Sequence, residues 1–225
     1  MTVDGIEAPI ENASLGAEGF MRFMSVDRQN FSVVDATLAG RRAKLVPLTM
    51  ALLEALAEAA TDPAIFRWHI ALMDGPAAIR VWVEKALAER AADKALPFVT
   101  LDAATGRVIG STRFFNIDAA NLKTEIGYTW LVAGAQRTGV NREAKYLMLR
   151  HAFETWRLRR VEFKAHARNE QSRAALLRLG AVEEGTLRKH MVMPDGSARD
   201  SVYFSIVDAE WPEVKARLEA QLRPA

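Results

Sequence analysis

Apolar residues recur with a helical period in five stretches of the chain, and one stretch is apolar over an unusually wide arc. The predicted helices cover residues 50–59, 76–90, 142–156, 170–179 and 209–223. In residues 142–156, Ala144 and Met148 belong to one apolar row, and Leu149 and Phe153 belong to a second. A helix on the surface needs a narrower stripe than these rows make together. The pattern therefore predicts that this helix packs against a sheet.

Alternating apolar and polar residues predict strands between these helices. They cover residues 38–48, as one strand or a hairpin, and residues 96–101, 107–116, 123–132, 161–168, 184–191 and 201–207. Turn-forming residues join two pairs of strands, at 102–106 and 194–197. The order is helices, an antiparallel meander, a helix, a strand, a helix and a hairpin. It predicts a mixed α/β (α+β) fold around one mostly antiparallel sheet with a parallel crossover at its centre.

The first 34 residues differ from the rest of the chain. Their periodicity is weak and Gly, Pro, Asn and Asp are scattered through them, so we expect an N-terminal arm at residues 1–34 and one globular domain at residues 35–225. The cluster FMRFM at residues 20–24 is the part of the arm suited to packing. Two interpretations stay open: the arm is a mobile tail, or this cluster docks on the domain or on a second subunit.

The turn before residues 142–156 has the composition of an anion-binding loop. It runs through Gln136, Arg137, Thr138, Gly139, Val140, Asn141 and Arg142. Gly139 is able to adopt backbone angles that a Cβ forbids, and Asn141 is a preferred N-cap residue. Such a turn leaves backbone N–H groups unpaired at the positive end of the helix dipole. The sequence therefore predicts a seat for phosphate oxygens.

Composition and charge exclude several classes of protein. Half of the 225 residues are apolar, which fits one domain with a sizeable core. The 30 basic and 28 acidic residues leave a formal charge of +2, and the basic residues are dispersed, so no nucleic-acid partner is expected. The absence of cysteine excludes disulfides and a cysteine nucleophile, and the four histidines lack metal-ligand spacing, so no metal is expected. No apolar run fits a membrane span and no signal peptide is recognisable, so we expect a cytoplasmic protein with no membrane partner.

Together these motifs resemble the GNAT N-acetyltransferase superfamily over residues 38–211, and within it the ribosomal-protein N-terminal acetyltransferases. The family's acetyl-CoA motif is Gln or Arg, two residues, Gly, one residue, then Gly or Ala, between the fourth strand and the third helix. Residues 136–140 (QRTGV) match it, but the last position is Asn141 where the family has Gly or Ala. We expect this difference to alter how the loop contacts the pyrophosphate and not to abolish acetyl-CoA binding. The further matches are EIGY at residues 125–128, Asn169 with Ser172, and LGAVEEG at residues 179–185.

The resemblance implies a site for acetyl-CoA, which is the expected cosubstrate. In the family the fourth and fifth strands splay apart, and the pantetheine arm pairs with the backbone freed at the splay. By position this maps to Trp130, Leu131 and Val132, with the Leu131 amide as a donor to the developing oxyanion. Pyrophosphate is expected on the amides of residues 137–142, after Gln136.

The implied chemistry is a direct attack of an amine on a thioester, which needs one group to take the ammonium proton and another to meet the leaving thiolate. Glu125 is the first candidate base, reached directly or through water, and the alternative is a solvated strand residue. His166 and His69 are the other candidates, although a lone histidine is more often structural. The resemblance assigns Ser172 to the thiolate and Asn169 to the cofactor. Capping alone explains Asn169, and the plain alternative for Ser172 is a surface serine.

The leading hypothesis is an acetyl-CoA-dependent N-acetyltransferase. Its acceptor amine is a peptide or protein N-terminus by the closest resemblance, or a small molecule such as a polyamine, amino acid or aminoglycoside. A second hypothesis is a GNAT-fold module that binds CoA without turnover, and a third is an RNA- or ribosome-associated protein, which the dispersed charge disfavours. Specificity is expected from the early helices, the loop between them and the last hairpin. A homodimer is weakly preferred.

Overall fold

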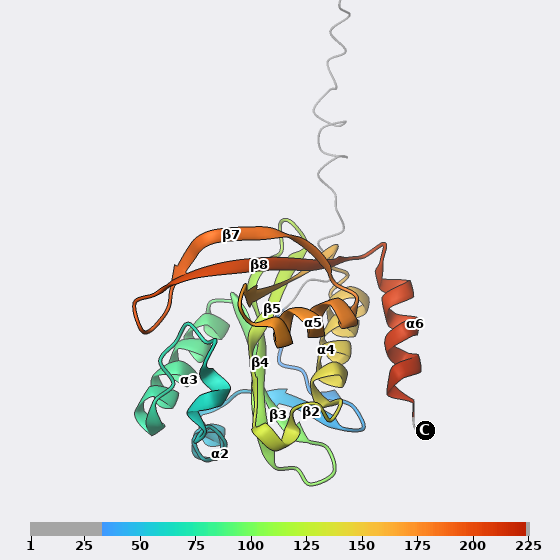
Figure 1. The fold of residues 1–225 in the computed structure, drawn as a ribbon. Helices are drawn as coiled ribbons and strands as arrows, with labels where there is room; N and C mark the ends of the chain where they lie inside the picture. Colours follow the sequence, from blue (N-terminus) through green and yellow to red (C-terminus); the bar gives the residue numbers. More distant parts are fainter. Residues whose placement is uncertain (1–32, 224–225) are drawn as a thin grey trace, which may run out of the picture. The chain divides into compact units, whose positions relative to one another are not determined.

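The computed structural model describes residues 33–223, which form one sheet with helices on both faces (Figure 1). The predicted arm, with its cluster at residues 20–24, lies outside the described residues except for its last two positions. The strands are β1 (Leu38–Ala39), β2 (Ala43–Pro47), β3 (Ala95–Asp102), β4 (Val108–Asp118), β5 (Lys123–Leu131), β6 (Arg160–His166), β7 (Val182–Val192) and β8 (Ala198–Val207). The helices are η1 (Met50–Leu52), α2 (Leu53–Ala59), η2 (Pro63–Phe66), α3 (Gly75–Ala91), η3 (Ala133–Ala135), α4 (Val140–Arg150), η4 (His151–Thr155), α5 (Glu170–Leu179) and α6 (Trp211–Leu222).

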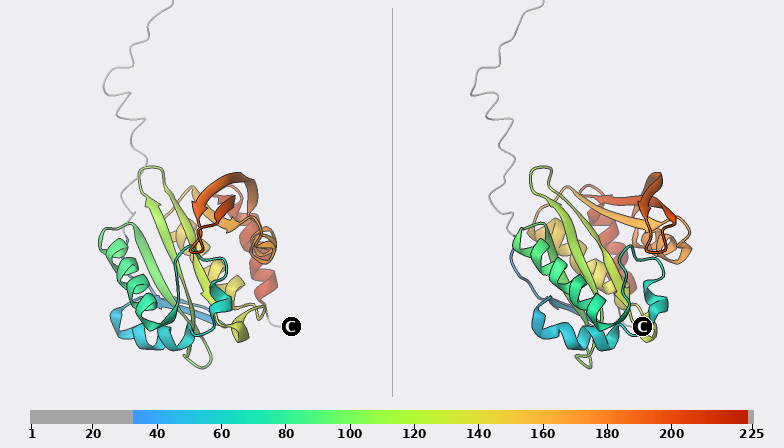
Figure 2. Two further views of the ribbon diagram at one scale, coloured as in Figure 1. Left: turned by 60° about the vertical axis from the view of Figure 1, so that its left-hand side comes forward. Right: turned by 90° about the vertical axis from the view of Figure 1, so that its left-hand side faces the viewer.

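The strand order β1-β2-β3-β4-β5-β6-β8-β7 confirms the predicted mixed α/β fold. All neighbouring strands are antiparallel except β5 and β6, which are parallel. This central pair is hydrogen-bonded only from Lys123 to Glu125 of β5, and beyond that point the two strands diverge (Figure 2). Among the strands that the structure describes, none pairs with the open side of the last part of β5. Residues 38–48 form a hairpin and not a single strand.

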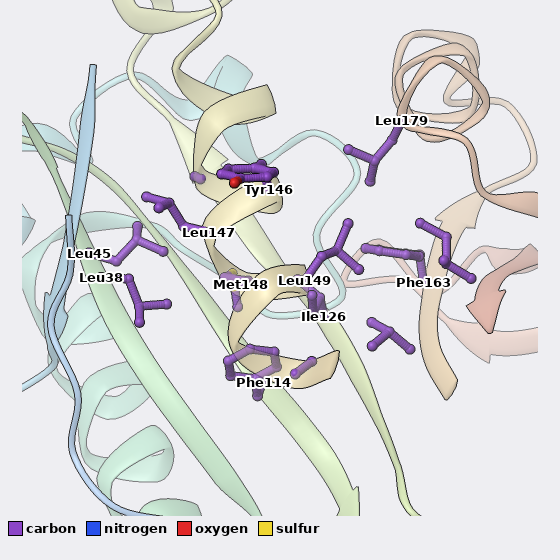
Figure 3. Packing of buried hydrophobic residues seen from close by; sticks show 14 of the residues in the cluster. Leu38, Leu45, Phe114, Ile126, Tyr146, Leu147, Met148, Leu149, Phe163 and Leu179 are labelled. Atoms are coloured by element: carbon purple, nitrogen blue, oxygen red, sulfur yellow. The ribbon is translucent and has the colours of Figure 1, made fainter. Parts of the chain in front are cut away.

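One face of the sheet is covered by α4, α5 and α6, and the other by α2 and α3 (Figure 1). Figure 3 shows residues 146–149 of α4 surrounded by Leu38, Leu45, Phe114, Ile126, Phe163 and Leu179. The wide apolar arc of α4 is therefore filled by strands from both halves of the sheet, as the sequence predicted. No helix among residues 33–223 has the length and hydropathy needed to cross a bilayer.

A β-bulge in β5 overturns the strict alternation predicted for this strand. Tyr128 has a φ of 51°, and Tyr128 and Thr129 together stand opposite the single residue Thr112 of β4. The extra residue reverses the facing of all later side chains. Ile126 consequently lies in the core beneath α4, whereas Trp130 lies in the core beneath α2 and α3. The alternation predicted for residues 123–132 would have placed these two side chains on one face, and that expectation is wrong.

Candidate active site

The predicted anion-binding loop enters α4 through Gly139, which has a φ of 91° and is the N-cap of the helix. Asn141 is the second residue of α4, so its prediction as N-cap is wrong. The left-handed backbone of Gly139 turns the chain into the helix before Asn141 is reached. The Oδ1 atom of Asn141 is buried without a hydrogen-bond donor among the described residues. The Thr138 hydroxyl donates to the Ala135 carbonyl at 2.7 Å and stabilises the loop.

The backbone N–H groups of residues 137–142 meet no acceptor anywhere in residues 33–223. They lie at the N-terminal end of α4, where the helix dipole contributes positive potential. A pyrophosphate accepts several hydrogen bonds and carries negative charge, so these residues fit the pyrophosphate of a CoA thioester.

Arg42, in the turn between β1 and β2, reaches the same loop. Its guanidinium donates to the Thr138 carbonyl at 2.6 Å, and a Cβ placed on Gly139 would lie 2.8 Å from Nη1. A cationic side chain therefore lies beside the unpaired amides. Sequence reasoning missed Arg42, because the contact spans 96 residues of chain.

Glu143 ties the first turn of α4 to the β1–β2 turn. Its carboxylate is 5% exposed and accepts three consecutive backbone N–H groups. They belong to Arg41, Arg42 and Ala43, at 3.0, 2.6 and 2.7 Å. The approach is so close that a Cβ on Gly40 would come within 2.5 Å of the Glu143 carboxyl group. This clamp fixes the start of α4 and the backbone that carries Arg42.

At the splay, the unpaired edge of β5 presents the backbone of Leu131. The Val132 N–H donates to the Ile109 carbonyl at 2.9 Å, and the Val132 carbonyl accepts from the Ala135 N–H at 2.9 Å. Val132, predicted to contact the cofactor, thus has no free backbone hydrogen-bonding group. Successive N–H groups of a strand point to opposite sides, so the Leu131 N–H points away from β4 toward the open side. The Gln136 side chain donates to the Leu131 carbonyl at 3.1 Å.

Glu125 is buried, with 3% of its surface exposed, so its interpretation as a solvated strand residue is wrong. Its carboxylate accepts from Asn116 Nδ2 at 3.1 Å and pairs with Lys164 Nζ at 3.5 Å. Burial raises the pKa of Glu125, while Lys164 and Asn116 act in the opposite direction. Six residues separate it from Leu131, or about 20 Å along a regular strand. A glutamate side chain does not bridge that distance to an amine held beside Leu131.

The histidines lie nearer to the splay. His69 Nε2 is 3.5 Å from the Thr129 carbonyl, two residues before Leu131 on β5. Burial lowers the pKa of His69 to about 4, so the ring is neutral at pH 7. His166 is also buried, and its Nδ1 accepts the Arg168 N–H at 3.0 Å, which places the ring proton of the neutral form on Nε2. Burial lowers the pKa of His166 as well.

Asn169 is the N-cap of α5, as predicted, and its Oδ1 accepts the Ser172 N–H at 3.1 Å. Capping therefore accounts for the orientation of Asn169. Ser172 is half-buried, and its hydroxyl has no protein partner in the described part of the chain. Its assignment to the leaving thiolate stays a prediction.

The family model of the acetyltransferase (GNAT) domain matches residues 42–182, which include the loop, the splay and the Asn169 cap. The chain belongs to the GNAT acetyltransferase family. It is 36% identical over 106 residues to YdaF of Bacillus subtilis, a protein provisionally named a ribosomal N-acetyltransferase. It is 31% identical over 103 residues to the ribosomal-protein-serine acetyltransferase of Escherichia coli.

Those two alignments cover 47% and 46% of this chain, and each spans 57% of the relative, a little over half its length. A solved GCN5-related N-acetyltransferase from Brucella melitensis is similar over a longer region. It is 32% identical with a TM-score of 0.78, and the match covers 85% of this chain and 87% of that one. This structural similarity therefore extends over most of both chains.

This GNAT chain also holds a lysine behind the bulge of β5. Lys145 of α4 is buried, and its ammonium donates to the hydroxyl groups of Thr129 at 2.7 Å and Thr112 at 3.3 Å. No carboxylate among the described residues pairs with it. Burial lowers the pKa of Lys145 to about 7. Thr129 is thus held from the α4 side by Lys145, while its carbonyl faces His69.

Proposed function

We propose that this protein is an N-acetyltransferase that transfers the acetyl group of acetyl-CoA to an acceptor amine. The observation that carries the proposal is a set of backbone N–H groups without partners among residues 33–223. They are the Leu131 N–H at the splay and the N–H groups of residues 137–142. Family membership supports it. In the reaction the amine nitrogen bonds to the thioester carbonyl carbon, the C–S bond breaks, and one proton leaves the nitrogen while CoA departs as thiol.

Each part of that reaction has a group on this chain. The amides of residues 137–142 and Arg42 hold pyrophosphate, and acetyl-CoA supplies the acetyl group as a thioester. The Leu131 N–H stabilises negative charge that develops on the carbonyl oxygen. The Ser172 hydroxyl, which has no protein partner among the described residues, protonates the leaving thiolate. Asn169 holds the start of α5 in place.

For the proton of the amine, the geometry favours His69 over Glu125. His69 contacts β5 two residues from Leu131 and is neutral at pH 7, so a ring nitrogen is able to accept a proton. With a pKa near 4 it is a weak base, and it acts best on amines that lose their proton near neutral pH. Glu125 is farther along the strand and already held by Lys164 and Asn116.

For the acceptor, a protein or peptide N-terminus is favoured, and a small-molecule amine is the alternative. Two relatives with ribosomal-protein acetylation in their names support this choice. A cytoplasmic location and a homodimer stay predictions. Size-exclusion chromatography with light scattering tests the homodimer.

The test of the function is a thiol-release assay with acetyl-CoA, peptides of varied first residue and a panel of small amines, with mass spectrometry of the products. We expect an acetylated amine equimolar with released CoA. Acetyl-CoA binding by calorimetry without turnover on any acceptor would instead identify a CoA-binding module.

The base is identified by comparing His69→Asn with Glu125→Gln. His69→Asn is expected to lower kcat about 100-fold while acetyl-CoA affinity is unchanged. Glu125→Gln is expected to lower the melting temperature and leave most of the turnover. A loss of about 100-fold in Glu125→Gln with an unchanged melting temperature would make Glu125 the base.

A further inference from the structure

A group of cationic and aromatic side chains surrounds Trp68, in the loop between η2 and α3. We call it the Trp68 cluster; its members are Arg67, Trp68, His166, Arg168 and Arg199. The Trp68 and His166 rings lie 4.7 Å apart between centroids. The guanidinium carbons of Arg67 and Arg168 lie 4.9 and 5.9 Å from the Trp68 ring. The cluster joins the loop before α3 to the ends of β6 and β8.

Arg199 is the buried arginine of the cluster, with 7% of its surface exposed. Its Nε donates to the Ser201 hydroxyl at 3.2 Å and its Nη1 to the Trp68 carbonyl at 3.3 Å, and both acceptors are neutral. None of the ion pairs within residues 33–223 includes Arg199. Its Nη2 has no acceptor among these residues and is not one of the fully buried polar atoms, so an outside anion is able to reach it. Burial lowers the pKa of Arg199. A guanidinium removed from water without an anion is costly.

The neighbouring carboxylates are engaged elsewhere. Asp200 accepts the Lys189 N–H at 2.6 Å, and Asp195 accepts the Ser197 N–H at 2.9 Å. Glu125 attracts Arg199 electrostatically but pairs with Lys164. The anion that would complete the Arg199 site is therefore not supplied by these neighbours.

The cluster lies on the acceptor side of the splay. His69 follows Trp68 directly and contacts the Thr129 carbonyl on the open edge of β5. Phe66, two residues before Trp68, packs on Trp130 with 5.4 Å between ring centroids. An amine beside Leu131 would therefore have the Trp68 cluster near the rest of its molecule.

We propose that the acceptor carries an anionic group, a carboxylate or a phosphate, close to its amine, and that Arg199 binds this group. The inference rests on the proposed acetyl transfer and specifies its substrate. Arg199 forms charge-assisted hydrogen bonds to the anion, Trp68 contacts the apolar part of the acceptor, and Arg67 and Arg168 add positive potential at the rim.

The test uses acceptors that differ only in charge. One arm compares peptides with Asp or Asn as the second residue, a second compares phosphoserine with serine there, and a third compares free amino acids with their amides. The parent is expected to favour the anionic member at least 10-fold in kcat/KM, through KM. The arm with the largest preference identifies the source of the anion.

Arg199→Gln is expected to remove the preference, because kcat/KM falls at least 10-fold further for the anionic acceptors than for the neutral ones, while Arg199→Lys keeps part of it. Arg107→Gln, on an exposed turn, is the control and should keep all of it. Equal kcat/KM for charged and neutral acceptors in the parent would overturn the proposal, as would equal losses on both in Arg199→Gln. If Arg199→Gln does not fold, the parent's preference still decides, together with the rim variants Arg67→Gln and Arg168→Gln.

Calorimetry of the same acceptors in the presence of CoA separates this proposal from the proposed function. Tighter binding of the anionic members without turnover would sustain the Arg199 site while acetyl transfer fails. Turnover without any charge preference would sustain acetyl transfer while the Arg199 site fails.

Discussion

The two sides of the splay between β5 and β6 are built from different parts of the chain. The cofactor side consists mainly of backbone groups from one continuous stretch, residues 131–142, held by side chains such as Glu143. The proposed acceptor side consists of side chains from residues 66–69, 166–168 and 199, which only the folded sheet brings together. A backbone site depends on chain conformation and tolerates varied side chains, whereas a side-chain site sets specificity. The chain should accordingly recognise acetyl-CoA as its family does and its acceptor in its own way.

The largest expected effect is the loss of acetyl-CoA binding when the backbone conformation of the cofactor side is disrupted. Gly139→Val should weaken acetyl-CoA binding at least 100-fold, because a β-branched residue disfavours a φ of 91° and its Cβ would lie 2.8 Å from Arg42. Calorimetry and circular dichroism measure affinity and fold. Gly134→Val is the matched control, since a Cβ there meets nothing within 4 Å. Native affinity in a folded Gly139→Val protein would remove the phosphate-binding interpretation of this loop.

The contrast between a site built from one continuous stretch and a site assembled from distant residues also explains what the sequence could predict. Periodicity located the helices and strands, and the loop at Gly139 was recognisable because its residues are adjacent in the chain. Two local errors came from left-handed residues that no periodicity signals. Gly139 takes the cap position expected for Asn141, and the bulge at Tyr128 separates Ile126 from Trp130.

Contacts between distant residues could not be predicted at all. Glu143 meets the β1–β2 turn across about a hundred residues of chain, and Arg199 meets Trp68 across 131. The burial of Glu125 depends on Lys164 from a different strand. Each of these residues is charged, and charged residues are seldom buried, so composition gave no signal for their burial.

The Glu143 clamp is the second place to test the backbone side. Glu143→Gln replaces a carboxylate that accepts three N–H groups with an amide that has one acceptor oxygen and presents N–H to the others. We expect a loss of about 3 kcal/mol in the free energy of unfolding by urea. Acetyl-CoA affinity should also fall, about 10-fold, because the start of α4 and Arg42 are no longer fixed. An unchanged affinity in the folded variant would show that the loop keeps its conformation without the clamp.

On the acceptor side, His69 makes stability sensitive to acid. The pKa of His69 is about 4 in the folded chain, against an ordinary value of 6.5 in the unfolded chain. Between these pH values the unfolded chain binds a proton at His69 and the folded chain does not. Stability should fall by about 2 kcal/mol from pH 6.5 to 5 through His69 alone. Denaturant unfolding of His69→Gln should show a shallower loss over this range than the parent. Identical slopes would mean that His69 is already solvated.

Lys145, on the α4 side of the bulge, should give a pH dependence of the same sign in a higher pH range. Its pKa is lowered from 10.5 to about 7, so stability should rise as pH increases from 7 toward 10.5, where the unfolded chain still carries the proton. Lys145→Met should flatten this rise and stabilise the protein at pH 7 by about 2 kcal/mol, as replacement of buried charge often does. The threonine pair left behind satisfies itself, with 2.8 Å between its hydroxyl oxygens. A destabilised Lys145→Met protein would show that the ammonium bonds outweigh the burial of charge.

The smallest expected effect concerns Asn141, and it tests whether this side chain contributes to acetyl-CoA binding or is only tolerated in the loop. Asn141 is the second residue of α4 with a buried, unpaired Oδ1, so Asn141→Ala removes an unsatisfied acceptor and favours the helix. We expect a gain of about 0.5 kcal/mol and an acetyl-CoA affinity equal to or above that of the parent. The control is Asn169→Ala, which removes an N-cap whose Oδ1 does accept a backbone N–H and should lose about 1 kcal/mol. Weaker acetyl-CoA binding in a stable Asn141→Ala protein would mean that the Asn141 side chain contacts the cofactor. Cofactor recognition would then depend on a side chain as well as on the backbone.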